Sequence, residues 1–330
     1  RQMCIRDSAW TVCLAVTLHS LARHSNPERN YRLWVVHDGL EEENMQELDK
    51  AVSGYPNAAL QFMTIPGKLE QMLRRRDVKR FSALAYARLL APSLFPRHSR
   101  IVYLDADTVL YADVAELYDT DLCGAAVGAV RDTAVLSSLV AGYPRRQLRK
   151  LQPLGLHDPF HYFNSGVLVL DLDRMREEDA EVRLLHVIEE HNELLEHPDQ
   201  DALNGALCEL TVPLHPRWNW HDGLTRRILK NDPRERFWRG VTPRQAVEAA
   251  LEPGILHYQG VHKPWRYNWR YEGERYERAM REAGLLHGPL PGRTLPAILK
   301  KHLYRPVYRM TRNKILRLQK QFEKEDGTCS

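Results

Sequence analysis

The sequence predicts an α/β fold built on a doubly wound, mainly parallel sheet. Three observations predict it: strand-like and helix-like patterns alternate along the chain, the apolar runs that resemble strands are short, and two carboxylates directly follow one of these runs, between Ile101 and Leu110. Such alternation is typical of a parallel sheet covered by helices on both faces. A chain of 330 residues, 43% of them hydrophobic and 27% charged, can form one large domain or two ordinary ones.

The elements follow one another with recognisable stop signals. Apolar residues at helical spacing predict helices at 11–24, 41–54 and 81–95. Apolar runs predict strands at 31–39, 59–67, 101–104, 125–132, 166–172 and 255–257. Gly54 closes the second helix and Pro66 stops the second strand. No charged residue interrupts the run at 101–104, which is therefore expected to be a fully buried central strand.

Asp105 and Asp107 directly follow this strand, at the edge where open α/β sheets bind ligands. Two hard oxygen ligands so close together favour Mg²⁺ or Mn²⁺, which commonly complete their coordination with substrate phosphates. Two alternatives stay open at this point. The pair can be an ordinary solvated loop, or the nucleophile and acid of an aspartyl phosphatase. The phosphatase also needs a later acidic pair, and no adjacent Asp-Asp pair or Gly-Asp loop follows in the chain.

Five motifs then occur in order, namely YARLL at 86–90, the Asp-x-Asp run at 101–110, FNSGVLVLDL at 163–172, HPDQDALNG at 197–205 and LHYQGVHKPW at 256–265. Together they resemble the family 8 retaining glycosyltransferases, in particular the bacterial lipopolysaccharide glucosyl- and galactosyltransferases, from about Leu14 to Tyr271. The resemblance implies a GT-A type, Rossmann-like nucleotide-sugar-binding domain with a mainly parallel mixed sheet over 1–275, and a C-terminal basic helical tail over 276–330. It also implies transfer of glucose or galactose from a UDP-sugar to a glycan or lipopolysaccharide-type acceptor.

A metal is the expected counter-charge for the donor diphosphate, because the chain has neither a GxGxxG turn nor a GxxxxGK[ST] loop. His257 ends the apolar strand at 255–257, and the resemblance makes it the third metal ligand beside Asp105 and Asp107. A neutral imidazole suits Mn²⁺ better than Mg²⁺, although Mg²⁺ stays open. Gly260 is expected to let the backbone approach the diphosphate, and Lys263 to supply a positive charge to it. The alternatives are a surface histidine and a lysine at the rim of a Pro-Trp turn.

The sugar is expected to contact four further residues. The resemblance places Arg88 on the sugar nucleotide, and its alternative is an ion pair with a surface carboxylate. Asp132 ends the predicted strand at 125–132, where its carboxylate can accept hydrogen bonds from sugar hydroxyls. Asn164 offers both a donor and an acceptor for the same purpose, and its alternative is a turn at the entry to the next strand. The resemblance makes Asp199 a ligand of the sugar hydroxyls, whereas its alternative is the N-cap of a helix that continues through Leu207.

The expected catalytic residues are Asp199, Gln200 and Lys263. The resemblance places Gln200 on the reactive face of the anomeric carbon, where a neutral amide oxygen suits stabilisation of an oxocarbenium ion better than covalent attack. The acceptor would attack from the face that the UDP leaves, so that configuration is retained. A double displacement through Gln200 stays open. Two other functions are also open: an inactive sugar-nucleotide-binding protein, and a self-glycosylating protein similar to glycogenin.

Charge is concentrated near the C-terminus. Of the net charge of +4, eight positive charges fall between Lys300 and Lys320 with no carboxylate, which leaves the rest of the chain at −4. Interleaved apolar residues make this segment typical of a helix that adsorbs to an anionic membrane surface. The alternative is a solvated helix that caps the domain. Nucleic acid is not an expected partner, because no recognition fold accompanies the basic segment.

Location and the first residues complete the expectations. The five cysteines are scattered without CxxC spacing, and no apolar run approaches the ~20 residues that span a bilayer. We therefore expect a cytoplasmic protein, peripheral on the inner face of the cell membrane. The resemblance predicts an apolar first strand before Asp7 and Trp10, and none precedes them. Residues 1–10 are accordingly expected to be truncated or foreign.

Overall fold

The computed structural model of the chain describes residues 8–67, 83–132, 135, 151–221, 241–260, 263–265, 272–286, 306, 309–310 and 312–324. The α-helices are α1 (Ser8–Arg23), α2 (Glu42–Val52), α4 (Ala91–Leu94), α5 (Val114–Tyr118), α8 (Leu172–Glu177), α9 (Ala180–His191), α10 (Pro198–Leu207), α12 (Pro243–Leu251) and α13 (Gly273–Glu282). The strands are β1 (Tyr31–His37), β2 (Ala58–Thr64), β3 (Arg100–Leu104), β4 (Thr108–Leu110), β5 (Val127–Arg131), β6 (Phe163–Asp171), β7 (Thr211–Pro213) and β8 (Ile255–His257). Short 3₁₀ helices include η1 (Ala83–Leu90) and η6 (Pro216–Asn219).

The strands form three sheets, the largest of them mixed, in agreement with the α/β prediction. A four-stranded sheet has the order β3-β6-β5-β7, a second sheet pairs β1 with β2, and a third pairs β4 with β8. In the four-stranded sheet β3, β5 and β7 share one direction, and β6 runs against them. Three of its four strands thus share one direction, although both pairings of β6 are antiparallel. The reversal of β6 was not expected, because its apolar run reads the same in either direction.

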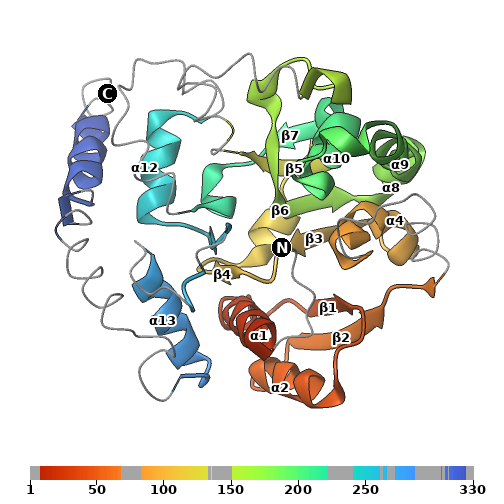
Figure 1. Cartoon of the computed structure of the whole chain (residues 1–330). Helices are drawn as coiled ribbons and strands as arrows, with labels where there is room; N and C mark the ends of the chain where they lie inside the picture. The colour runs from red at the N-terminus through yellow and green to blue at the C-terminus, as the bar shows by residue number, and fades with distance from the viewer. Residues whose placement is uncertain are drawn as a thin grey trace.

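Helices cover both faces of this sheet, and β6 shows why. Val167 and Val169 belong to a core cluster with residues of α1, α2, α12 and α13. Leu168 and Leu170 belong to a second cluster with residues of η1, α4, α9 and α10. Since successive side chains of a strand point to opposite faces, a continuous apolar strand is buried on both sides. Figure 1 shows α9 and α10 on one side of β6 and α12 on the other.

The strand before the two carboxylates departs from its prediction. All residues of β3, from Arg100 to Leu104, are half-buried and none is fully buried. The reason is position, because β3 is an edge strand of the four-stranded sheet. Along 101–110, strand residues become fully buried only after the carboxylates, in β4, Thr108–Leu110. Asp105 and Asp107 therefore lie in a tight loop between two strands.

The basic C-terminal segment is helical over 312–324 and packs on the body of the protein. Ile315 is 2% exposed within the core cluster of α1 and α12, and Leu318 and Phe322 pack partly against it. Arg244 of α12 lies over the Phe322 ring, 5.7 Å from its centroid. The helix runs beside α12 (Figure 1). The described part of the chain contains no helix with the length and apolar character needed to cross a bilayer.

Candidate active site

The loop that carries Asp105 and Asp107 is held from below by α1. The Thr17 hydroxyl shares its one proton between the backbone oxygens of Thr108, at 2.7 Å, and of Ala106, at 2.9 Å. The Cys13 thiol also donates to Ala106 O, at 2.9 Å. Small polar side chains on a buried helix face thus satisfy the carbonyl groups of a tight turn. This contact fixes the backbone from which both carboxylates project.

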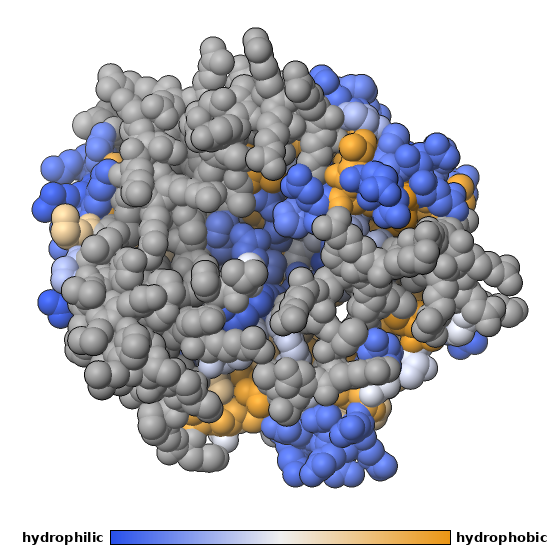
Figure 2. Space-filling model, viewed as in Figure 1, coloured by the Kyte–Doolittle hydropathy of each residue, from blue (hydrophilic) through white to orange (hydrophobic). Residues whose placement is uncertain are grey.

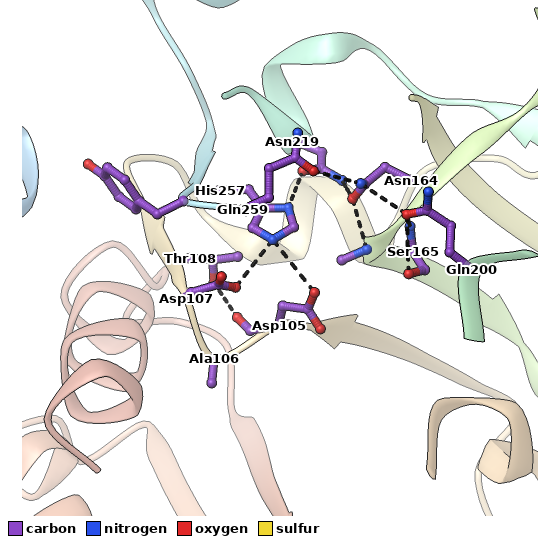
Figure 3. A network of polar contacts seen from close by, with 12 residues as sticks. Asp105, Ala106, Asp107, Thr108, Asn164, Ser165, Gln200, Asn219, His257 and Gln259 are labelled. Atoms are coloured by element: carbon purple, nitrogen blue, oxygen red, sulfur yellow. Dashed lines mark hydrogen bonds and ion pairs between the residues drawn. The ribbon is translucent and has the colours of Figure 1, made fainter. Parts of the chain in front are cut away.

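Three side chains meet above this loop and form a candidate metal site. Asp105, Asp107 and His257 each offer a ligand atom, and these atoms lie within 4.8 Å of one another. His257 Nε2 is 3.6 Å from Asp105 Oδ2 and 3.2 Å from Asp107 Oδ1 (Figure 3). The pairing of β4 with β8 places Thr108 opposite His257, which brings the imidazole to the loop. The structure therefore brings together the three ligands that the sequence predicted.

Gly166 forms one wall of this cluster. A Cβ at Gly166 would lie 2.7 Å from His257 Nδ1 and 2.8 Å from Asp105 Oδ2, and real Cβ atoms essentially never approach other atoms so closely. The ligand cluster thus depends on a missing side chain in β6. Two carboxylate oxygens and one imidazole nitrogen within reach of one cation are a donor set that suits Mn²⁺, and Mg²⁺ less well. The residues present fit a divalent metal.

Each carboxylate of the loop also has its own cation. Arg88 Nη2 is 2.9 Å from Asp105 Oδ1, and Arg88 Nη1 is 3.3 Å from Asp199 Oδ2. Lys263 is 6% exposed and forms an ion pair with Asp107, with its Nζ also 2.9 Å from Tyr258 O. The alternative of a lysine at the rim is therefore wrong. Arg88 and Lys263 thus lie beside the cluster of Asp105, Asp107 and His257, where they can also contact an anion that binds there.

The electrostatics of Asp107 follow from this crowding. Burial alone would raise the pKa of the Asp107 carboxyl, but the neighbouring His257 and Lys263 outweigh it and hold the pKa well below its ordinary value. The carboxyl therefore stays charged, as a metal ligand must. Lys263 is itself held by aromatic rings, because its ammonium lies 5.5 Å from the centroid of the Trp10 ring and 5.7 Å from that of the Trp265 ring.

Tyr103 completes the surroundings of Asp105; it lies inside the Asp-x-Asp run at 101–110, but no role was predicted for it. Its hydroxyl donates to Asp105 Oδ1 at 2.7 Å, and the Arg88 guanidinium lies 4.4 Å from its ring centroid. Burial raises the pKa of this phenol well above its ordinary value, so it remains a donor. The sequence did contain one indication of this contact: Tyr103 stands two residues before Asp105, and residues two apart in a strand lie on the same face.

A buried network of amides adjoins the ligand cluster. Asn164 Nδ2 donates to Asp132 Oδ2 at 3.1 Å and to Gln200 Oε1 at 3.1 Å. Gln200 Oε1 also accepts from Ser165 N at 3.1 Å, and Gln200 Nε2 donates to Asp132 Oδ2 at 3.1 Å. Asn164 lies within β6, so the alternative of a turn at this position is wrong. Figure 3 shows this network continuing from the imidazole of His257 to Gln200.

The start of α10 brings Asp199 and Gln200 to this place. The helix begins at Pro198 with His197 as its N-cap residue, so Asp199 is not the N-cap and its alternative role is wrong. Asp201 instead accepts hydrogen bonds from the backbone of Glu196 and His197, at 2.8 and 2.9 Å. The Asp199 side chain thus remains directed at Arg88.

The other expected residues lie as follows. Gly260 has a positive φ of 84°, a conformation that favours glycine, and no other atom lies within 4 Å of the point that a Cβ would occupy there. The backbone at Gly260 is therefore open. The sequence alone predicts that an acceptor contacts the polar loops at 136–161 and 219–240, and these loops lie partly outside the described residues. In the view of Figure 2, hydrophilic residues gather in a hollow near the centre of the face.

Comparison with known sequences gives a consistent result. The family model for glycosyl transferase family 8 matches residues 4–269. General stress protein A of Bacillus subtilis (strain 168) is 26% identical over 256 residues, which cover 76% of this chain and 82% of that protein. Lipopolysaccharide 1,2-glucosyltransferase of Escherichia coli (strain K12) is 28% identical over 190 residues, which cover 57% of this chain and 51% of that protein. The matched region thus spans about half the length of the latter.

Comparison with solved structures identifies the fold. The galactosyltransferase LgtC, solved with donor and acceptor sugar analogs, is similar with a TM-score of 0.67 at 23% identity, over 89% of this chain and 97% of that chain. The bifunctional glycosyltransferase WbbM, in its apo structure, is similar with a TM-score of 0.69 at 25% identity, over 83% of this chain and 48% of that chain. The predicted GT-A fold class is confirmed.

Proposed function

This chain belongs to glycosyltransferase family 8, and on that premise we propose that it is a retaining, metal-dependent transferase that moves glucose or galactose from a UDP-sugar to a saccharide acceptor. The observation that carries the proposal is the contact between two groups of residues. The cluster of Asp105, Asp107 and His257 is joined through Arg88 to Asp199, the residue next to Gln200. A site for a diphosphate and its cation therefore lies beside a site for a sugar.

Different residues of the chain would bind the diphosphate with its cation and the sugar. Asp105, Asp107 and His257 would hold a divalent cation, Mn²⁺ by the donor set, which when bound neutralises charge on the leaving diphosphate. Lys263 supplies a second positive charge, and Gly260 leaves the backbone accessible to a phosphate oxygen. We place the diphosphate between these groups.

The sugar-binding side is already ordered by hydrogen bonds. Asp132, Asn164 and Asp199 offer donors and acceptors to sugar hydroxyls, and Arg88 fixes the Asp199 carboxylate. Gln200 Oε1 accepts from both Asn164 and Ser165, which makes it a poorer nucleophile than a free amide. We therefore assign Gln200 to stabilising positive charge at the anomeric carbon. Attack by the acceptor on the face of the departing UDP would then retain configuration.

We also propose that the basic segment adsorbs to anionic lipid, through charge and not through insertion. The exposed residues of 312–324 include Arg312, Lys314, Arg317 and Lys320. The apolar face of this helix is used elsewhere, since Ile315 packs in the core of the body. An acceptor linked to a lipid, as expected of a lipopolysaccharide-type substrate, would then be close at hand. A cytoplasmic enzyme at the inner face of the membrane fits this arrangement.

A donor panel tests the proposed activity. Purified protein is incubated with UDP-glucose, UDP-galactose, UDP-N-acetylglucosamine or GDP-mannose, with Mn²⁺ or with excess chelator, and release of the nucleoside diphosphate is measured. The proposal expects Mn²⁺-dependent UDP release from one of the first two donors, increased by saccharide acceptors. Nucleoside diphosphate release that is undiminished in chelator contradicts the proposed role of the metal. Release from GDP-mannose alone contradicts the proposal that the donor is a UDP-sugar.

A further inference from the structure

Asn219 lies between the ligand cluster and the sugar-binding side, and neither the motifs nor the proposal so far uses it. Its Oδ1 is 2.9 Å from His257 Nδ1, and its Nδ2 donates to Asn164 Oδ1 at 2.8 Å. Asn219 is only 6% exposed, so contact with solvent does not explain why a polar residue stands here. Figure 3 shows the amide between the imidazole of His257 and the amide of Asn164.

The orientation of each amide follows from one backbone group. The Gly166 N–H can only donate, and it donates to the side chain of Asn164 at 3.0 Å, so the atom that it meets is Oδ1. The neighbouring atom of Asn219 must then be Nδ2, which leaves Asn219 Oδ1 facing the imidazole. His257 Nδ1 therefore carries the proton and donates it to Asn219. When the imidazole is neutral, as it must be to bind a metal, the lone pair then lies on Nε2, which faces Asp105 and Asp107.

Backbone pairing fixes the position of Asn219 relative to His257. The residue ends η6, and Trp220 N donates to Ile255 O at 2.9 Å. In the reverse direction His257 N donates to Trp220 O at 2.8 Å. The chain segments around the two side chains are therefore joined by hydrogen bonds in both directions, so the distance between amide and imidazole does not depend on a flexible loop.

We propose that Asn219 is a positioning residue with two separable roles. Its carbonyl oxygen holds His257 in the tautomer and ring orientation that a metal ligand needs. Its amide nitrogen holds Asn164, whose own amide donates to Asp132 and Gln200, so the same residue orients the sugar-binding side. The proposal rests on the metal-dependent transfer proposed above, and it adds the residue that aligns the metal site with the reacting sugar.

Two substitutions separate these roles by their chemistry. Asn219→Asp keeps an acceptor for His257 Nδ1–H but loses the donor to Asn164. Asn219→Leu has a similar volume and loses both. Mn²⁺ affinity is measured from the electron paramagnetic resonance signal of free Mn²⁺, and nitrogen coordination from the electron spin echo modulation of bound Mn²⁺. The kcat and KM for donor hydrolysis are measured separately, and thermal unfolding shows that each variant is folded.

The expected results differ between the variants. Asn219→Leu weakens Mn²⁺ binding by about 10–100-fold and alters the nitrogen modulation, as loss of a ligand's hydrogen-bond partner commonly does. Asn219→Asp binds Mn²⁺ within about threefold of wild type, or more tightly, yet loses about tenfold or more in kcat. Asn57→Asp is the control, because it makes the same change at an amide whose bonds go to Ser25, Asn26 and Arg29. It is expected to leave both quantities unchanged.

The outcomes that overturn the proposal are distinct from those that overturn the function. If Asn219→Leu binds Mn²⁺ as tightly as wild type with the same nitrogen modulation, the role toward His257 is wrong. If Asn219→Asp keeps the wild-type kcat, the role toward Asn164 and Gln200 is wrong, and this test stands even if Asn219→Leu does not fold. If wild type itself binds no Mn²⁺, the proposed metal-dependent function fails first.

Discussion

Gly166 and His257 are closely packed in the candidate site, because a Cβ added at the glycine would clash with Cε1 of the imidazole ring. A side chain at Gly166 would place its Cβ 2.7 Å from His257 Nδ1. We expect Gly166→Ala to push the imidazole away from Asp105 and Asp107 and to lower Mn²⁺ affinity by about 10-fold or more, because misplaced ligands bind a metal poorly. Mn²⁺ titration measures this.

The matched control is Gly54→Ala, at a position with nothing within 4 Å of an added Cβ. It should leave Mn²⁺ binding unchanged. If Gly166→Ala also binds Mn²⁺ like wild type, the imidazole is not held where the metal site requires it.

Asp107→Asn should abolish Mn²⁺-dependent UDP release and also lower stability. The substitution leaves Lys263 buried without its counter-charge, which typically costs about 3–5 kcal/mol. Asp119→Asn is the control, since it breaks an exposed, solvent-screened ion pair with Arg29 and should change stability little. Urea denaturation compares the two variants with wild type. A fully active Asp107→Asn enzyme would contradict its role as a ligand.

The same carboxylate sets a pH dependence. Because His257 and Lys263 hold the pKa of Asp107 below its ordinary value, the stability that Asp107 contributes is present at neutral pH and lost as the pH falls through the folded-state value. The difference in unfolding free energy between wild type and Asp107→Asn should therefore narrow only in strongly acidic solution. A difference that narrows already between about pH 5 and pH 7 would contradict this.

Gln200→Ala should lower kcat by about 10²-fold while leaving Mn²⁺ affinity near that of wild type. The reason is that Gln200 hydrogen-bonds to Asn164, Ser165 and Asp132, and its hydrogen bonds do not include the three residues of the candidate metal site. Steady-state kinetics measures the fall in kcat, and Mn²⁺ titration of the same sample measures the metal affinity. Equal losses in metal affinity and kcat would mean that the residue acts through the metal site.

Charge reversal at Arg312, Arg317 and Lys320 should weaken binding to vesicles that contain anionic lipid, by about 1 kcal/mol for each residue. Binding by the wild type should also fall as salt is added, because exposed charges are screened. Sedimentation with anionic and with neutral vesicles measures the difference. Binding that is insensitive to salt and to these substitutions would show that the basic face is not used.

Much of the site was predictable because its residues stand at the ends of apolar runs. Asp105, Asp132 and His257 each close or follow a strand, and strand ends meet at sheet edges. The direction of β6 and the half-buried state of β3 were not predictable, since both depend on which strands pair. Pairing is a tertiary property that an apolar run does not encode.

Asn219 shows the same limit within the active site. It is separated from His257 by 38 residues and stands between Trp218 and Trp220 without any motif around it. The flanking Trp218 and Trp220 are buried, which indicates that the segment is ordered but not which residues it contacts. The backbone hydrogen bonds between Trp220, which follows η6, and β8 bring the two side chains together, so sequence patterns could not assign this residue.

The most direct test of the central claim is diffraction from crystals grown with Mn²⁺ and UDP, recorded at the manganese absorption edge. The account predicts one strong anomalous peak within ligand distance of Asp105, Asp107 and His257, with the UDP diphosphate between that peak and Lys263. An anomalous peak at another place, or a diphosphate bound away from these residues, would contradict it.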